Sequence, residues 1–207
     1  MENPKIETII FDLGGVLVDW NPEYLYTKIF KDDPNKMDWF LKTVCTTSWN
    51  MEQDTGRTFE QGSQILIQDY PEYKKEILVF YERWEEMLKG EINDTVLILN
   101  SLKELNKVKL YALTNWSAET FPIAKRRFGF LQQFEGIVVS GEEKTRKPYS
   151  KIYEITLERY GLSPETCLFI DDSIDNVNAA KSLHINALHY TSALQLKSDL
   201  NQLGLLS

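Results

Sequence analysis

Residues 6–15, IETIIFDLGG, decide the fold, because a short apolar run ends directly in the acidic residue Asp12 and two glycines. The run Ile6–Phe11 is typical of a strand that is buried on both faces of a parallel sheet. Ligands of open α/β sheets bind beyond the carboxyl ends of the strands, so we expect Asp12 at that edge. Asp is also a common turn former and helix cap, which leaves a purely structural role for Asp12 open.

Further runs of the same kind follow in the second half of the chain. They are Lys109–Leu113, Gly136–Val139, Cys167–Ile170 and, more weakly, Ile185–His189. Helical patterns lie between or beside them at Asp94–Leu105, Ser117–Phe128, Ser150–Tyr160 and Ile174–Leu183. Strand–helix alternation of this sort predicts an α/β fold, an open, mostly parallel, Rossmann-like sheet with helices on both faces.

Residues 19–91 interrupt this alternation with helix-like segments rich in aromatic residues and with no convincing strand. The segments are Pro22–Phe30, Pro34–Val44, Phe59–Asp69 and Glu72–Leu88. The insertion is far longer than the usual connection of about 4–6 residues. We therefore predict a small helical cap domain at 19–91 and an α/β core made of 1–18 and 92–207. Most of its aromatic residues are expected to form the core of this domain, and a ligand pocket is the alternative.

The composition limits the partners and the compartment. A net charge of −8 disfavours nucleic acid and anionic membranes as main partners, although a metal and one lysine can still attract an anionic substrate. No apolar segment resembles a signal peptide or the roughly 20 residues that span a bilayer. The two cysteines, Cys45 and Cys167, fit reduced thiols, so we expect a cytoplasmic protein. The oligomeric state stays open.

Two of the later strand ends carry a hydroxyl and a lysine. Thr114 and Asn115 close the second strand before a predicted helix, where a hydroxyl and backbone N–H groups can hold a phosphate oxygen. N-capping of the helix explains them equally well. Lys147 precedes Pro148, which fixes the backbone and starts the next helix, whereas the rest of this charged run is expected to be a solvated loop.

The fourth strand ends in adjacent carboxylates, Asp171 and Asp172. They repel each other unless a cation is present, and oxygen ligands of this kind suit Mg²⁺, although helix capping is an alternative. Taken in order, the strand ends supply a nucleophile, a phosphate anchor, a positive charge and a metal site in one crevice. Nucleotide phosphate sites are disfavoured, because the chain has no G-x-G-x-x-G or Walker lysine after the first strand.

These strand ends resemble the four motifs of the haloacid dehalogenase-like (HAD) hydrolase superfamily. The matching segments are FDLGG at 11–15, LTN at 113–115, RKP at 146–148 and FIDDSIDN at 169–176. The insertion resembles a C1-type cap, which closes over the site. The segment FDLGGVLVDWNP at 11–22, together with Trp49 and the Asp54-x-Gly56 segment, is similar to sequences of the bacterial subgroup of YihX-type sugar-1-phosphate phosphatases. The resemblance implies a phosphomonoester phosphatase acting on a small phosphorylated metabolite such as a sugar phosphate.

The resemblance also implies catalytic roles for the matched residues. Asp12 would attack phosphorus and form an aspartyl phosphate. Thr114 and the Asn115 amide would hold the transferring phosphoryl group, and Lys147 would stabilise Asp12 and the developing charge.

A magnesium site is implied in the same way. Mg²⁺ would bind Asp12, the carbonyl of Gly14 and Asp172, with Asp171 as a further ligand directly or through water. Asp175 is similar to a carboxylate that orients the catalytic lysine.

Gly14 departs from the family pattern D-x-D, in which the second Asp is the general acid and base. Loss of positioned proton transfer costs about 10²–10⁴-fold in rate. Either the leaving group is a good one, as in anomeric sugar phosphates, or the acid comes from the cap. Asp19, Asp54 and Arg57 are candidates for cap or entrance contacts, against a plain surface role. His184 and His189 are expected to be ordinary residues near the last strand.

Three other functions stay open at this point. One is 2-haloacid dehalogenation, in which a carboxylate attacks carbon without a metal, and the acidic pair Asp171-Asp172 argues against it. Another is a non-catalytic binding or regulatory protein that lost its acid at Gly14. The third is phosphotransfer to another acceptor, as in mutases.

Overall fold

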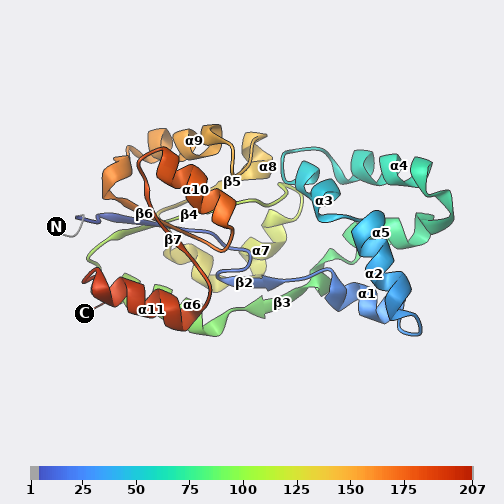
Figure 1. Ribbon diagram of the computed structural model, residues 1–207, viewed down its shortest axis with the longest axis horizontal. Helices are drawn as coiled ribbons and strands as arrows, with labels where there is room; N and C mark the ends of the chain where they lie inside the picture. The colour runs from blue at the N-terminus through green and yellow to red at the C-terminus, as the bar shows by residue number, and fades with distance from the viewer. Residues whose placement is uncertain (1–4, 207) are drawn as a thin grey trace.

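The computed structural model describes residues 5–206, and its centre is a parallel sheet in the order β5-β4-β1-β6-β7 (Figure 1). The strands are β1 (Thr8–Phe11), β4 (Lys109–Thr114), β5 (Gly136–Val139), β6 (Cys167–Asp171) and β7 (Asn186–His189). Each differs from its predicted range by at most two residues at either end, and the predicted α/β fold is confirmed. Residues 1–4, part of the N-terminal stretch considered for a signal peptide, and residue 207 lie outside the described residues.

Strand β1 lies at the centre of this sheet and sets the position of the strand ends. Phe11 is paired with Ala112 of β4 on one side and with Ile170 of β6 on the other. Parallel strands end at the same edge of a sheet. Asp12, Thr114 and Asp171 therefore come to one edge although they are far apart in the sequence.

Helices cover both faces of the sheet, as Figure 1 shows. On one face lie α9 (Ser150–Tyr160) and α10 (Ile174–Ser182), and on the other lie α6 (Asn93–Leu105) and α11 (Ala193–Gln202). Successive side chains of β1 point to opposite faces of the sheet. Ile10 packs in the apolar cluster of Tyr153 and Val177. Ile9 packs on the other face, in the cluster of Leu99 and Leu200. Both faces are buried, which explains the nearly continuous apolar character of these strands.

The helix predicted at 117–128 begins later than expected. Helix α7 is Phe121–Arg127, and residues 118–120 before it form a turn. The Ser117 hydroxyl accepts the backbone N–H of Glu119, a local bond that competes with helix formation. The predicted helix is present, and its expected start at residue 117 is wrong by four residues. Short elements complete the core: η3 (Gly129–Gln133), α8 (Ser140–Glu143) and η4 (Pro164–Thr166).

The insertion is helical, as predicted, and lies beyond the carboxyl edge of the sheet (Figure 1). Its elements are α1 (Glu23–Ile29), α2 (Pro34–Thr43), α3 (Thr47–Gln53), α4 (Phe59–Asp69), η1 (Pro71–Tyr73), α5 (Lys74–Glu82) and η2 (Trp84–Met87). Helix α4 starts with a capping box, in which Thr58 and Gln61 each accept the other's backbone N–H. The single helix predicted at 72–88 is wrong, since the chain leaves α-helical geometry at Arg83.

Two short strands join the insertion to the core and correct the expectation that 19–91 contains none. Strand β2 (Val18–Trp20) pairs antiparallel with β3 (Leu88–Glu91). Each is too short to produce an alternating pattern, and β3 contains Lys89 and Gly90, which are poor strand formers. The predicted boundary after residue 18 falls inside this ribbon, and the division into two domains stays a prediction.

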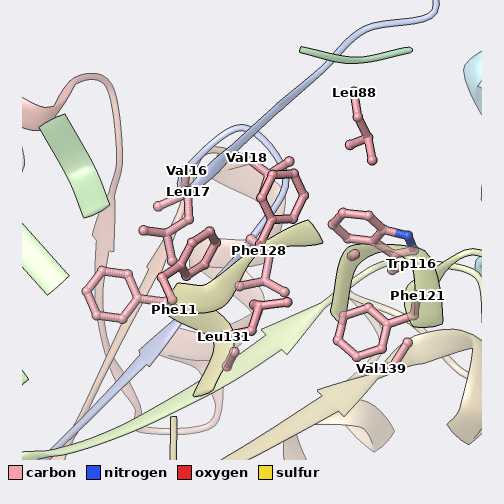
Figure 2. Close-up of a cluster of buried hydrophobic side chains, with 14 of the residues drawn as sticks. Phe11, Val16, Leu17, Val18, Leu88, Trp116, Phe121, Phe128, Leu131 and Val139 are labelled. Atoms are coloured by element: carbon pink, nitrogen blue, oxygen red, sulfur yellow. The ribbon is translucent and has the colours of Figure 1, made fainter. Parts of the chain in front are cut away.

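The aromatic residues of the insertion pack mainly against one another. Tyr26 and Phe40 have ring centroids 5.2 Å apart, and Trp49 meets Phe80 edge-on at 5.1 Å. The same apolar cluster continues into the core. Figure 2 shows the part of it that is built from Phe11, Val16, Leu17, Val18, Leu88, Trp116, Phe121, Phe128, Leu131 and Val139. Among the described residues, no helix is both long and apolar enough to cross a membrane.

Candidate functional site

Asp12 stands directly after the central strand and is held there by backbone bonds. Its N–H donates to the Ile170 carbonyl oxygen at 2.8 Å, and its Oδ1 accepts the N–H of Leu13 at 2.7 Å. Gly15 follows with φ +75°, and a Cβ at this position would collide with the carboxylate of Asp172. The glycine therefore allows the loop after β1 to approach the end of β6.

Lys147 lies at the centre of the site and is 1% exposed. Its Nζ lies 2.8 Å from Oδ1 of Asp12 and 2.7 Å from Oδ2 of Asp171, and it donates to the Leu113 carbonyl at 2.9 Å. The Asn115 side chain fixes its backbone, since Oδ1 accepts the Lys147 N–H at 2.9 Å and Nδ2 donates to the Lys147 carbonyl at 3.0 Å. The structure thus brings together the predicted residues of all four strand ends.

Asp171 is fully buried and its carboxylate has several partners. Besides Lys147, it accepts the backbone N–H of Ser173 at 2.8 Å and the Asn176 side-chain amide at 2.9 Å. Asp175, which the sequence suggested as the residue that orients Lys147, is exposed on α10. Asp171, itself held by Asn176, contacts the lysine instead, so that interpretation of Asp175 is wrong.

Three carboxylates converge at this edge of the sheet. One oxygen each of Asp12, Asp171 and Asp172 lies within 4.8 Å of the others. If all three are ionised, the single ammonium of Lys147 leaves an excess of two negative charges. A small group of hard oxygen ligands with excess negative charge fits Mg²⁺, and the missing Cβ of Gly15 gives Asp172 room to join it.

Burial and neighbouring charges shift the pKa values of this cluster in opposite directions. Burial raises the pKa of Asp12 well above its usual range, and Asp171 and Asp172 add to this against the effect of Lys147. Burial also acts on Asp171, but the ion pair with Lys147 and two hydrogen bonds outweigh it and lower its pKa. A cation beside Asp12 would favour its carboxylate form, which is the form that can act as a nucleophile.

The hydroxyl of Thr114 is a candidate anchor for an anion. Its Oγ1 is buried, and within residues 5–206 it has no hydrogen-bond partner. A buried polar atom without a hydrogen-bond partner costs free energy, and a ligand that accepts a hydrogen bond from this hydroxyl would remove that cost. This hydroxyl lies at the end of β4, next to the strand that carries Asp12.

A cavity of about 110 Å³ lies between the insertion and the core. Gly14, Asn115 and Ser117 line it from the core, and Asp54 lines it from the insertion. Five aromatic residues also line it: Trp20, Phe59, Tyr81, Trp84 and Trp116. Two residues of the candidate site, Gly14 and Asn115, therefore border a chamber whose wall is shared by the insertion and the core.

The other candidates from the sequence lie elsewhere. Asp19 accepts the Tyr24 hydroxyl at 2.9 Å and lies 3.4 Å from the Lys89 ammonium. Arg57 is bonded within the insertion, to the Gln53 side chain and the Trp49 carbonyl. His184 is exposed, and a ring nitrogen of His189 lies 2.9 Å from the Asp172 carbonyl oxygen.

Ser140 joins the insertion to the core through a contact that the sequence does not indicate. Its hydroxyl donates to the Asp54 carbonyl and accepts the N–H of Trp116 at 2.9 Å. It thereby ties the insertion to the loop after β4. A lone serine after a strand carries no signal of such a long-range bond.

Comparison with known proteins gives relatives along nearly the whole chain. The chain is 30% identical over 200 residues to the sesquiterpene phosphatase astK of Aspergillus oryzae, covering 94% of each protein. It is 25% identical to a phosphorylated carbohydrates phosphatase of Thermotoga maritima, covering 89% of this chain and 84% of that protein.

Solved structures show the same fold. The HAD family enzyme bt-2542 of Bacteroides thetaiotaomicron, solved in complex with magnesium and inorganic phosphate, superposes with a TM-score of 0.66 at 24% identity. The match covers 90% of this chain and 94% of that one. Residues 6–184 match the family model of the haloacid dehalogenase-like hydrolases, and this chain belongs to that family.

Proposed function

We propose that this chain is a Mg²⁺-dependent phosphatase that hydrolyses phosphomonoesters through an aspartyl phosphate on Asp12. The observation that carries the proposal is the contact of buried Lys147 with both Asp12 and Asp171, beside the third carboxylate of Asp172. A nucleophile, a fixed positive charge and metal ligands at one edge are what phosphoryl transfer needs. The phosphatases among the relatives support this choice.

In this proposal the Asp12 carboxylate attacks phosphorus, and the bond to the ester oxygen breaks with its electron pair moving onto that oxygen. Water then attacks phosphorus, which releases phosphate and restores Asp12. Lys147 offsets the charge that Asp12 and the phosphoryl group bring together. The unpaired Thr114 hydroxyl would donate to a phosphoryl oxygen. The backbone N–H of Asn115 would help to hold the same phosphoryl group.

The residues that would hold Mg²⁺ are Asp12, Asp172 and the Gly14 carbonyl, with Asp171 directly or through water. When bound, the ion supplies positive charge that neutralises the phosphoryl oxygens. The bt-2542 enzyme, crystallised with magnesium and phosphate on the same fold, supports this assignment.

We infer that the substrate is a small phosphorylated metabolite, such as a sugar phosphate. The aromatic cavity next to Gly14 favours a leaving group with an apolar face, which sugar rings and isoprenoid chains both have. The Trp20 indole N–H is buried without a partner among the described residues, and it could donate to a substrate oxygen. Residues 19–91 would act as a C1-type cap over this cavity.

We also infer a cytoplasmic location, because Cys45 and Cys167 are free and buried. The net charge of −8 supports the expectation that neither nucleic acid nor a membrane is a partner.

Removal of divalent metal is expected to stop turnover of p-nitrophenyl phosphate. Without the cation, Lys147 alone must offset three carboxylates and the phosphoryl oxygens, so we expect a loss on the order of 10²-fold or more. The measurement is the initial rate after treatment with EDTA, and excess Mg²⁺ should restore it.

A wild-type protein that is folded but hydrolyses no phosphate ester with Mg²⁺ would support a non-catalytic protein instead. Metal-independent release of chloride from 2-chloropropionate would support a dehalogenase. Transfer of the phosphoryl group to an added sugar phosphate faster than to water would indicate a mutase. A screen of sugar phosphates and prenyl monophosphates then separates the two kinds of apolar leaving group.

A further inference from the structure

The site proposed above has no evident proton donor for the leaving group. Lys147 is bonded to two carboxylates and a carbonyl, and its pKa is raised because Asp12 and Asp171 outweigh the effect of burial. Asp171 is held in its ionised form. Expulsion of an alkoxide needs a donor within hydrogen-bond reach of the ester oxygen. That donor must come from outside this cluster.

Gly14 leaves open space on the side of the cavity. A Cβ at Gly14 would meet no atom within 4 Å, so the position two residues after the nucleophile faces room rather than packed side chains. The same cavity is lined by Asp54, which among its described lining residues is the one with a carboxyl group. Gly14, two residues after the nucleophile, and Asp54 therefore face the same space.

Asp54 is fixed in place by the core, although it belongs to the insertion. It follows α3 as its C-terminal cap residue. Its backbone carbonyl accepts the hydroxyl of Ser140, and the backbone N–H of Ser117 is close enough to its carboxyl group to lower the pKa of that group. Gly56, with φ +99°, lets the chain turn against the loop of Lys144. The backbone that carries the Asp54 carboxyl group is therefore fixed against the core.

The environment of Asp54 also suits proton transfer near neutral pH. Burial raises its pKa to about 7, against the opposing effects of Arg146 and of the Ser117 N–H. Tyr81 also lines the cavity, and the negative charge of Asp54 contributes to raising the pKa of Tyr81. A general acid works best with a pKa near the working pH.

We propose that Asp54 is the general acid and base of this enzyme, in place of the acid missing at Gly14. This inference rests on the proposed phosphatase function. As Asp12 bonds to phosphorus and the ester P–O bond breaks, the Asp54 carboxyl proton passes to the ester oxygen and the alcohol leaves. The Asp54 carboxylate then takes a proton from the attacking water, while the P–O bond to Asp12 breaks with its electrons returning to that carboxylate.

The test compares two kinds of leaving group in Asp54→Asn. An alkyl phosphate such as glycerol 2-phosphate needs a proton on its leaving oxygen, whereas p-nitrophenyl phosphate does not. We expect kcat/KM to fall on the order of 10²–10⁴-fold for the alkyl ester and only a few-fold for the aryl ester. The matched control is Glu52→Gln, an exposed residue of α3. Equal losses for both esters would overturn the proposal.

A second readout is the pH dependence of the alkyl-to-aryl ratio of kcat/KM. Because Asp54 must be protonated for the first step, this ratio should fall above about pH 7 in the wild type and stay flat in Asp54→Asn. Titration of the cluster cancels in the ratio, and above about pH 7 both phosphate monoesters are mainly dianions. A decline of the same shape in the variant would count against Asp54.

Gly14→Asp provides an independent check, since its side chain has room in the cavity. We expect it to restore alkyl ester turnover at least tenfold in Asp54→Asn and to change the wild type much less. The same gain in both backgrounds would show that Asp54 supplies no proton. Wild-type protein inactive on both esters would instead contradict the phosphatase function itself.

Discussion

Replacing Asp12 by asparagine is expected to reduce phosphatase turnover by about 10⁴-fold or more, because the amide cannot attack phosphorus. Losses of this order follow removal of the nucleophile in other enzymes. The fold should remain, since the Asn carbonyl can accept the bonds that Leu13 and Lys147 now donate to Oδ1. The measurement is kcat with p-nitrophenyl phosphate and saturating Mg²⁺.

The control for this variant is Asp32→Asn, which changes the same charge at an exposed position of the insertion. It should leave kcat within about twofold of the wild type, as surface substitutions usually have small effects. Denaturant unfolding should show that Asp12→Asn is as stable as the wild type or more so, because one of three mutually repelling carboxylates is gone. Turnover that survives the substitution would rule out Asp12 as the nucleophile.

Replacing Lys147 by methionine is expected to destabilise the protein by about 3–5 kcal/mol at neutral pH. The side chain is buried between Asp12 and Asp171, and its removal leaves two buried carboxylates without a positive charge beside them. For a chain of this size, such a change lowers the Tm by roughly 6–20 °C. Urea unfolding without added metal measures it, and turnover should also fall on the order of 10²-fold or more.

The direction in which pH changes this loss of stability can also be predicted. In the variant, burial without the lysine charge raises the native pKa values of the two carboxylates above their unfolded values, so stability is lost as pH rises through them. The deficit relative to wild type should therefore shrink as pH falls toward 4, and Mg²⁺ should reduce it at neutral pH. Lys151→Met, at an exposed position of α9, is the control. A deficit that is independent of pH would indicate that packing, and not charge, is lost.

The positions of Asp12, Thr114, Lys147 and Asp171 at one edge could be predicted because each follows a buried strand or lies just beyond one. Parallel strands end at the same edge, so order along the chain is enough to bring their ends together. The structure confirms this arrangement to within hydrogen-bond distance for Lys147 and its two carboxylates.

Asp175 and Asn176 show where such reasoning fails. The two residues are neighbours on α10, but successive helical residues point about 100° apart, at 3.6 residues per turn. The sequence motif contains both, and only the orientation of the helix decides that Asn176 contacts Asp171 while Asp175 faces solvent. The ribbon of β2 and β3 is a similar case, since its two segments pair across the whole insertion.

The sequence by itself determined the α/β fold, the helical insertion and the chemistry gathered at the strand ends, because these follow from local runs of apolar and charged residues. Only the tertiary structure decided how the insertion meets the core. The bond from Ser140 to Asp54 and the aromatic cavity shared by Gly14 and Trp84 join segments distant in the chain. Contacts of this kind depend on how the whole chain packs, and no local pattern records them.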